Sequence, residues 1–222
     1  MGDEYTWPEA GGTFFTFKRT RDDAYTWMRQ SLHEYAYMYR ESAEVLMERA
    51  CNAPGLLNVH AIPAVYLFRH FVELSLKDLL VQTGRLNDKT ESYPDKHRLE
   101  PLWQKLRALL DEAELGDSDD DRATLDVVDD LIRQLDTADP SAMAFRYPVG
   151  TQRKDGSREV LLSDNFEYFD MRTFRDQAER LAHFLEACGE QVHVYLEIHD
   201  DLAREYQDFL RDETRDFLED DW

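Results

Sequence analysis

Apolar side chains recur at helical spacing along most of this chain. Between residues 20 and 50 they return every three or four positions, as expected of a helix with one face on a core. Four segments with this period come after it: residues 61–82, 97–113 and 122–136, and the stretch from about residue 170 onward. Short loops join them, which predicts a mainly α protein, a helical bundle of four to six helices.

The period changes after the predicted helix at residues 122–136. Two β-capable runs, residues 142–152 and 157–162, flank the tripeptide Lys154-Asp155-Gly156. An Asp-Gly pair between two such runs is a strong hairpin signal, because glycine accepts the positive φ that tight turns require. The sequence therefore predicts one β-hairpin, over about residues 142–162, inserted in the bundle.

These patterns divide the chain into three parts. Residues 1–20 contain a Trp-Pro and a Gly-Gly pair and are expected to form an N-terminal arm. Residues 21–189 are expected to form the helical domain with its hairpin. Residues 190–222 are expected to form an acidic C-terminal helix packed on the same domain. Gly189, between the last two parts, would either divide the final helix or kink it.

A polar stripe interrupts the most apolar segment, residues 62–80, which otherwise has the composition of a buried helix. Arg69, Glu73 and Lys77 follow one another at four-residue spacing, and His70 lies beside them. Isolated charges inside a protein are far too costly, so these groups must be paired or must face a cleft. The stripe is therefore either an internal ion network or a site, and the sequence leaves both interpretations open.

Composition limits the functional classes. The 222 residues include 47 acidic and 26 basic side chains, for a net charge of −21. This charge argues against broad DNA or RNA binding, which draws its affinity from neutralised phosphates, although it allows a local basic pocket. No apolar run reaches the roughly 20 residues of a membrane span, and no signal peptide is recognisable. With only Cys51 and Cys188, no disulfide framework is expected, so we expect a cytoplasmic protein without membrane contact.

The polar stripe belongs to a longer pattern of residues in a fixed order: Arg69 or His70, Glu73, Lys77, Leu80, Gly84, His97, Leu99 and Leu102. Residues 145–148, which read Phe-Arg-Tyr-Pro, precede the last predicted helix. In order and spacing, these motifs resemble the HEPN superfamily of helical domains from bacterial and archaeal defence and toxin systems. The resemblance covers about residues 21–189 and implies a helical fold that forms a homodimer.

Active members of that superfamily cut RNA without a metal ion, using an Arg that is followed by a His with four to six residues between them. Such a His can act as a base toward the ribose 2′-hydroxyl, while the Arg holds the phosphate. Here two residues separate Arg180 from His183 and seven separate Arg175 from His183, so neither pair has that spacing. We therefore favour a non-catalytic binding or regulatory module. The alternative is a metal-independent endoribonuclease with a divergent Arg/His site.

Two groups of residues are candidates for the site. The first contains polar residues that the fold would bring together: Arg69, His70, Glu73, Lys77, His97, Arg146 and Tyr147. The second is Arg180 with His183, three apart on one helix face. In a nuclease, Arg146 or Arg180 would hold phosphate, and His97 or His183 would be the base. Otherwise the first group is an internal network and the second an exposed charged face.

Other chemistry receives little support. The chain has no His-x-x-x-His or Cys-x-x-Cys motif and no glycine-rich phosphate loop, so we expect no metal site and no cofactor. Tyr35, Tyr37 and Tyr39 crowd the first predicted helix, where they either pack in the core and on the surface or form an aromatic interface with a second subunit. We expect a homodimer, with a protein or an RNA as the other candidate partners.

Overall fold

The computed structural model of this chain describes residues 8, 10, 11, 14, 31–90, 92–93, 96–116, 118–152, 154–162, 166 and 168–219. The chain divides into two compact units, Met1–Gln30 and Ser31–Trp222, and every described helix and strand belongs to the second. The side chains of residue 151 and of residues beyond 211 are not described. Most of the predicted arm, residues 1–20, and residues 21–30 of the first predicted helix lie outside the described residues.

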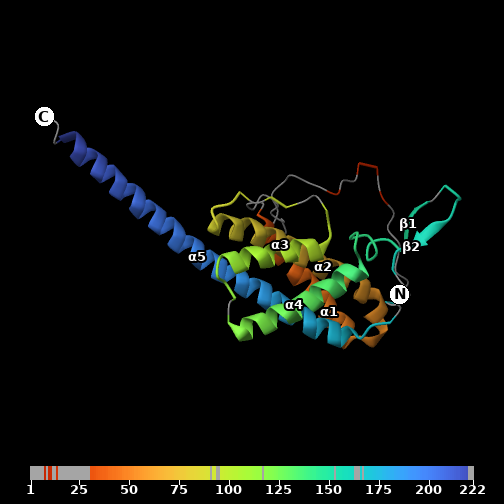
Figure 1. Ribbon diagram of the computed structural model, residues 1–222. Coiled ribbons are helices and arrows are strands. Elements are labelled where there is room, and N and C mark those ends of the chain that lie inside the picture. Colours follow the sequence, from red (N-terminus) through yellow and green to blue (C-terminus); the bar gives the residue numbers. More distant parts are fainter. Residues whose placement is uncertain are drawn as a thin grey trace. The chain divides into compact units, whose positions relative to one another are not determined.

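Among the described residues, five α-helices make up most of the second unit (Figure 1). They are α1 (Leu32–Asn52), α2 (Leu57–Leu86), α3 (Leu99–Glu112), α4 (Asp119–Ala138) and α5 (Met171–Glu219). Strands β1 (Val149–Gln152) and β2 (Arg158–Val160) pair as an antiparallel hairpin between α4 and α5. The predicted fold class, mainly α with one inserted hairpin, is confirmed to this extent. None of the described helices is long and apolar enough to cross a lipid bilayer.

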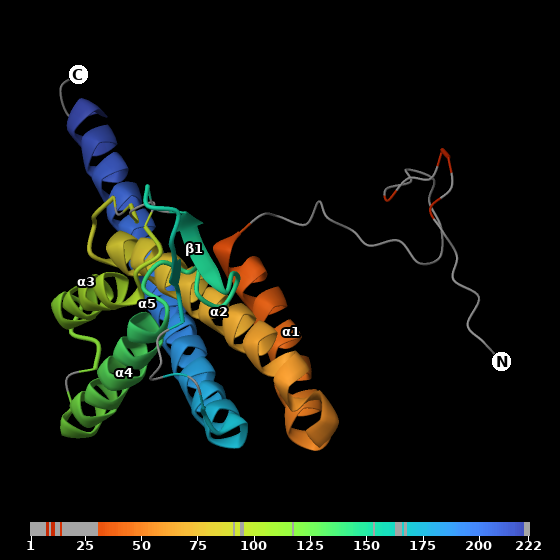
Figure 2. The ribbon, with the colours of Figure 1, turned by 90° about the vertical axis from the view of Figure 1, so that its right-hand side faces the viewer.

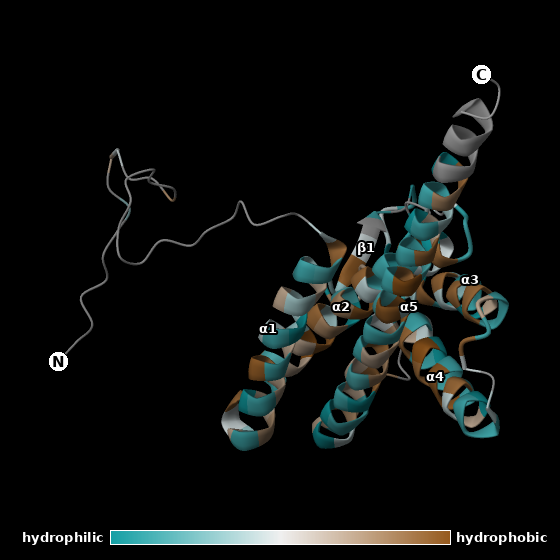
Figure 3. Ribbon diagram, turned by 90° about the vertical axis from the view of Figure 1, so that its left-hand side faces the viewer, coloured by the Kyte–Doolittle hydropathy of each residue, from teal (hydrophilic) through white to brown (hydrophobic). Residues whose placement is uncertain are grey.

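Helix α2 is the central helix of the bundle. It contacts α1, α3 and α5, and α3 in turn contacts α4 (Figure 2). The core between them includes Trp103, Leu76, Leu80, Leu106 and Ile132, all fully or almost fully buried. Figure 3 shows the hydrophilic sides of the surrounding helices turned outward. The apolar period read in the sequence therefore produces a core around a helix that is buried on most of its sides.

Both ends of α2 differ from the prediction. Pro63 was expected in the first turn but lies inside the helix, which begins six residues earlier. Proline is tolerated there because it is exposed, and water can reach the carbonyl of Val59 that loses its partner. Gly84, expected as the C-terminal cap, is buried within the helix. The positive φ that ends the helix belongs to Asp88 (54°), and the Lys89 N–H closes the turn on the Gly84 carbonyl at 2.8 Å.

Helix α5 is one continuous helix of 49 residues, roughly 70 Å long. Gly189 lies within it beside Leu79 of α2 and does not divide it. Its first half packs on the bundle, and Leu196 is its last buried residue in the described part. Beyond it, Arg85 of α2 donates a hydrogen bond to Asp200 at 3.4 Å. This contact is followed by residues 201–211, which are exposed (Figure 1). The packing of residues 190–222 as a whole on the domain stays a prediction.

The hairpin forms where the Asp-Gly pair predicted it. Val149 pairs with Val160, and Gln152 pairs with Arg158, with an irregularity of register between them. Gly156 has the positive φ, 85°, that the turn requires. The sequence signal was therefore specific enough to locate the turn, although the strands are shorter than the runs that predicted them.

Candidate functional site

Glu73 lies at the centre of the polar stripe of α2, with only 1% of its surface exposed. Its Oε1 accepts hydrogen bonds from Lys77 Nζ and from His97 Nδ1, both at 2.8 Å, and its Oε2 accepts one from Arg69 Nη1 at 3.3 Å. The four-residue spacing places Arg69 and Lys77 one turn to either side of Glu73. We call Arg69, Glu73, Lys77, His97 and Asp139 the Glu73 cluster.

Arg69 ties three parts of the bundle together. Its Nε donates to the Asp139 carbonyl at the end of α4 (3.1 Å), and its Nη2 donates to the His97 carbonyl before α3 (2.6 Å). Asp139 Oδ1 accepts the backbone N–H groups of Met143 and Ala144 at 2.7 and 2.9 Å, which fixes the turn after α4. Arg69 is fully buried, so its contacts serve the fold and leave no group for a macromolecular ligand.

The charges of the Glu73 cluster cancel. Two cations, Arg69 and Lys77, lie among two carboxylates, Glu73 and Asp139, and all four are buried. Burial alone would raise the pKa of Glu73, but the hydrogen bonds from Lys77 and His97 outweigh it and hold that pKa below its ordinary value. The cluster therefore has no surplus positive charge to attract phosphate, and its geometry fits an internal network better than a phosphate site.

His97 differs from the rest of the Glu73 cluster because 54% of its side chain is exposed. Its Nδ1–H donates to the ionised Glu73 carboxylate, which leaves Nε2 as the acceptor. A histidine oriented by a carboxylate in this way has the arrangement of a general base. This pair is the one part of the first predicted group that a ligand can reach and that has acid–base geometry.

The remaining members of the first predicted group lie beside the Glu73 cluster, among aromatic rings; they are Arg146, Tyr147 and His70. The Arg146 guanidinium lies 5.9 Å from the ring centre of Tyr66 and 5.4 Å from that of Tyr147. Tyr66 stacks on His70 with ring centres 6.2 Å apart, and Tyr39 of α1 meets His70 edge-on at 4.4 Å. Burial lowers the pKa of His70 more than the nearby Glu73 carboxylate raises it, so a neutral ring is favoured. The guanidinium of Arg146 thus makes cation–π contacts with Tyr66 and Tyr147.

Arg180 and His183 lie on the exposed side of the packed half of α5. Arg175, the third member of that charged face, pairs with the neighbouring Asp176 at 2.8 Å. Among the described residues, no hydrogen bond or ion pair joins Arg180 or His183 to His97 or to Arg146. The geometry matches an exposed charged face and does not assemble the residues that a nuclease site would need.

Two buried carboxylates were missed by sequence analysis. Asp136 accepts the N–H of Leu99 and the Nε–H of Arg98, both at 2.7 Å, and so caps the start of α3. The other is Asp139, the partner of Arg69 in the Glu73 cluster. The signal for Asp136 was present, because it follows Ile132 by four residues and so falls on the apolar face of α4. An acid at a core-facing position calls for a buried partner.

Two cavities lie outside both predicted groups. A cleft of about 680 Å³ between α1, α2 and α5 is lined by polar side chains that include His33, Asp78, Glu190 and His193. Burial raises the pKa of Asp78, and His33 and a hydrogen bond with Gln82 oppose that shift only in part. A smaller cavity of about 290 Å³ between α2, α4 and α5 has a mainly apolar lining. Neither cavity is lined by a predicted site residue.

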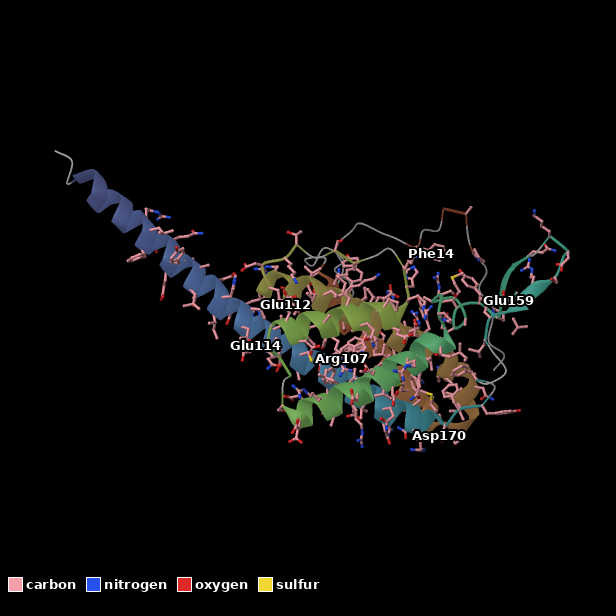
Figure 4. The ribbon with its side chains drawn as sticks, in the orientation of Figure 1. Phe14, Arg107, Glu112, Glu114, Glu159 and Asp170 are labelled. Atoms are coloured by element: carbon pink, nitrogen blue, oxygen red, sulfur yellow. The ribbon has the colours of Figure 1, made fainter. Side chains whose placement is uncertain are left out.

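The described residues contain no group of three or more His, Cys, Asp or Glu side chains arranged to hold a metal ion. Both cysteines are free, and burial raises the pKa of the Cys188 thiol to about 12, so this thiol is a poor nucleophile at neutral pH. Arg107 and Glu112, which Figure 4 labels on the last turns of α3, belong to ion pairs with Asp126 and Lys89 respectively.

Comparison with known proteins assigns no family: no protein-family model, curated protein or solved structure matches the chain. The resemblance to the HEPN superfamily therefore rests on the order and spacing of its motifs and stays a prediction.

Proposed function

We propose that this protein is a non-catalytic binding module whose working surface is the second half of α5. The observation that carries the proposal is a stripe of large apolar side chains that the bundle does not cover. Its members are Tyr195, Ile198, Leu202, Tyr206 and Phe209, each between 44% and 63% exposed. We call these five residues the α5 stripe.

The members of the α5 stripe are three or four positions apart, so they line one face of the helix over roughly 20 Å. Apolar side chains scattered singly over a surface are ordinary, but a contiguous apolar face on a helix marks an interaction site. Tyrosine and phenylalanine are also enriched at protein interfaces. The first half of α5 buries its apolar face against the bundle, which makes the exposed second half the exception.

The Glu73 cluster also supports the proposal that this protein is a non-catalytic binding module. Its charges are neutralised internally and its bonds join α2 to the loop before α3 and to the end of α4. The polar stripe of the sequence thus has a structural task, and the binding surface lies elsewhere. The order of the motifs supports a HEPN-like character for the bundle, with a defence or toxin setting as part of the proposal.

The proposal retains a homodimer through the tyrosines of α1. Tyr35 and Tyr37 are exposed, whereas Tyr39 is partly buried and packs on His70. Tyr37 lies nearly opposite Tyr35 around the helix and lines the cleft between α1, α2 and α5. Tyr35 is therefore the exposed aromatic side chain that supports an interface on α1, a helix other than α5.

The hydrogen bond between His97 and Glu73 favours a second candidate function, the metal-independent endoribonuclease. His97 would act as the base through Nε2, and a cation would have to hold the phosphate. The nearest cations of the Glu73 cluster, Arg69 and Lys77, are buried and paired with carboxylates. This candidate therefore has a base but lacks an accessible phosphate ligand among the residues that contact it.

The test is RNA cleavage in excess EDTA, with a mixed labelled RNA pool and with His97→Ala, His183→Ala and His193→Ala variants beside the wild type. If the protein is a binding module, the wild type cleaves no RNA. Cooperative unfolding of the same sample shows that the protein tested is folded. Cleavage that is lost in His97→Ala or in His183→Ala would overturn the proposal and identify the base. His193→Ala is the control, because His193 is an exposed histidine of α5 outside both predicted groups.

A further inference from the structure

The charge around the α5 stripe indicates the chemistry of its partner, an inference that rests on the proposed function. We propose that the stripe binds a basic amphipathic helix of another protein. The apolar face of that helix would cover the stripe, and its Lys and Arg side chains would meet the acidic side chains beside it. This is the helix-on-helix form of recognition, in which apolar anchors give affinity and flanking charges select the partner.

The exposed half of α5 is strongly acidic. Between residues 197 and 211 it carries five carboxylates, Glu197, Asp200, Asp201, Glu205 and Asp208, against Arg204 and Arg211. Both arginines are already paired within the helix, with Asp201 and Asp208 respectively. The segment therefore keeps an excess of three negative charges within the helix, although Asp200 also pairs with Arg85 of α2 and Glu197 lies 3.5 Å from His193.

The acidic side chains are not spread evenly around the helix. At 100° per residue, Asp201, Glu205 and Asp208 lie along one edge of the α5 stripe. The opposite edge carries His199, Ala203 and Gln207, of which His199 alone is ionisable and already lies beside Asp88 and Asp200. A helix lying on the stripe would thus meet carboxylates on one side and uncharged groups on the other.

A second copy of α5 would fit this arrangement poorly. In a parallel pair, each acidic edge would face the uncharged edge of the other copy, and in an antiparallel pair the two acidic edges would face each other. Neither arrangement supplies a positive charge, and each copy brings a net charge of −21. A basic helix supplies counter-charges in either direction, and the negative field of the protein would speed its approach.

The experiment uses the full chain and a synthetic peptide of about 21 residues, three heptads with Ile at a, Leu at d and Lys at e and g. An analogue with Glu in place of every Lys keeps the apolar face and reverses the charge. A scrambled peptide keeps the charge and removes the apolar face. Binding is measured by fluorescence anisotropy at low and at high salt.

We expect the basic peptide to bind the wild type, with an affinity that falls as salt rises. Leu202→Asp should weaken binding at least about tenfold, since it places a charge in the centre of the apolar contact. Glu205→Lys should weaken it as well, because it reverses one charge of the acidic edge. Val127→Asp is the matched control: Val127 on α4 is 58% exposed, close to the 61% of Leu202, and lies outside the stripe.

Equal binding of the basic, acidic and scrambled peptides, or no binding of the basic one, would overturn the inference. So would a full-strength complex with a Leu202→Asp variant that circular dichroism shows to be folded. Light scattering tests whether a second copy of this protein covers the stripe. A wild-type dimer that Leu202→Asp converts to a monomer would assign the stripe to self-association. That result would overturn the basic partner and leave the binding module standing, whereas RNA cleavage by the wild type would overturn the module itself.

Discussion

Glu73 and His97 are joined by a hydrogen bond of 2.8 Å although 24 positions separate them in the sequence. This bond fixes the loop before α3 on the surface of α2. Arg69 strengthens the same junction, because it donates to the His97 carbonyl from the next turn of α2. The Glu73 cluster thus works as a clamp between helices, and its removal should be felt first in the stability of the fold.

Glu73→Gln is expected to lower the free energy of unfolding by about 3–5 kcal/mol. The variant keeps the size of the side chain but leaves Arg69 and Lys77 buried without the carboxylate between them. Urea unfolding followed by circular dichroism measures the change. Asp130→Asn is the control, because Asp130 pairs with Arg133 on the exposed surface and such pairs contribute about 1 kcal/mol or less. Equal effects of the two variants would contradict the clamp.

His70 is expected to make the protein less stable as the pH falls from about 7 to 5. Burial lowers its pKa in the folded state, so between the unfolded value near 6.5 and the lower folded value the unfolded chain binds more protons. Stability contributed by the neutral ring is therefore present above that window and is lost as the pH falls through it. The slope from one such proton is at most about 1.4 kcal/mol per pH unit.

The pH dependence is measured by urea unfolding at several pH values. His70→Phe should reduce the loss of stability between pH 7 and 5, since an aromatic ring remains between Tyr39 and Tyr66 without a titrating group. His183→Gln, on the exposed face of α5, should keep the wild-type slope. An unchanged slope in His70→Phe would show that other groups carry the dependence.

Asp136→Ala is expected to lower the free energy of unfolding by about 1–3 kcal/mol, because it leaves the buried N–H of Leu99 without an acceptor. Thermal and urea unfolding both report this change. Ser118→Ala removes the corresponding cap at the start of α4, which is exposed to water, and should cost about 1 kcal/mol or less. If Asp136→Ala were the milder of the two, the buried cap would contribute less to stability than the exposed one.

Gly189→Ala is expected to stabilise the protein by about 0.5–1 kcal/mol, the usual gain for replacing a glycine inside a helix. The added methyl group would meet its nearest neighbour, Leu79 Cδ2, at 3.9 Å, which is ordinary contact. Gly116→Ala should do the opposite, because Gly116 has a φ of 87° that an alanine rarely adopts. A melting temperature lowered by Gly189→Ala would indicate that the helix needs a glycine at this position.

The helices and the hairpin were largely predictable because local signals determine them. The apolar period located all five helices, and Asp155-Gly156 located the turn of the hairpin. The helix ends were less accurate. Gly84 and Pro63 were given their usual roles at helix ends, whereas the ends of α2 depend on Asp88 and on residues before Pro63.

The candidate site was predictable only where its residues share one helix. The four-residue spacing of Arg69, Glu73 and Lys77 placed them together correctly. The contacts of Asp139 with Arg69, and of Arg146 with Tyr66, depend on how the chain returns after α4, which no local pattern encodes. The continuous path of α5 past Gly189 was also left open, because a glycine inside a helical pattern is compatible with a break, a kink or a straight helix.

A chain that ends at residue 201 is expected to unfold within about 1 kcal/mol of the full-length protein, because the side chains described in the removed part of α5, those of residues 202–211, are all exposed. Helical circular dichroism should fall in proportion to the helix removed. Leu196→Ala in the full chain is the contrast: Leu196 is the last buried residue of α5, and truncation of a buried leucine costs about 2–5 kcal/mol. A shortened chain that loses as much stability as Leu196→Ala would mean that the α5 stripe packs on its own protein in solution. That packing would remove the exposed face on which the binding module depends.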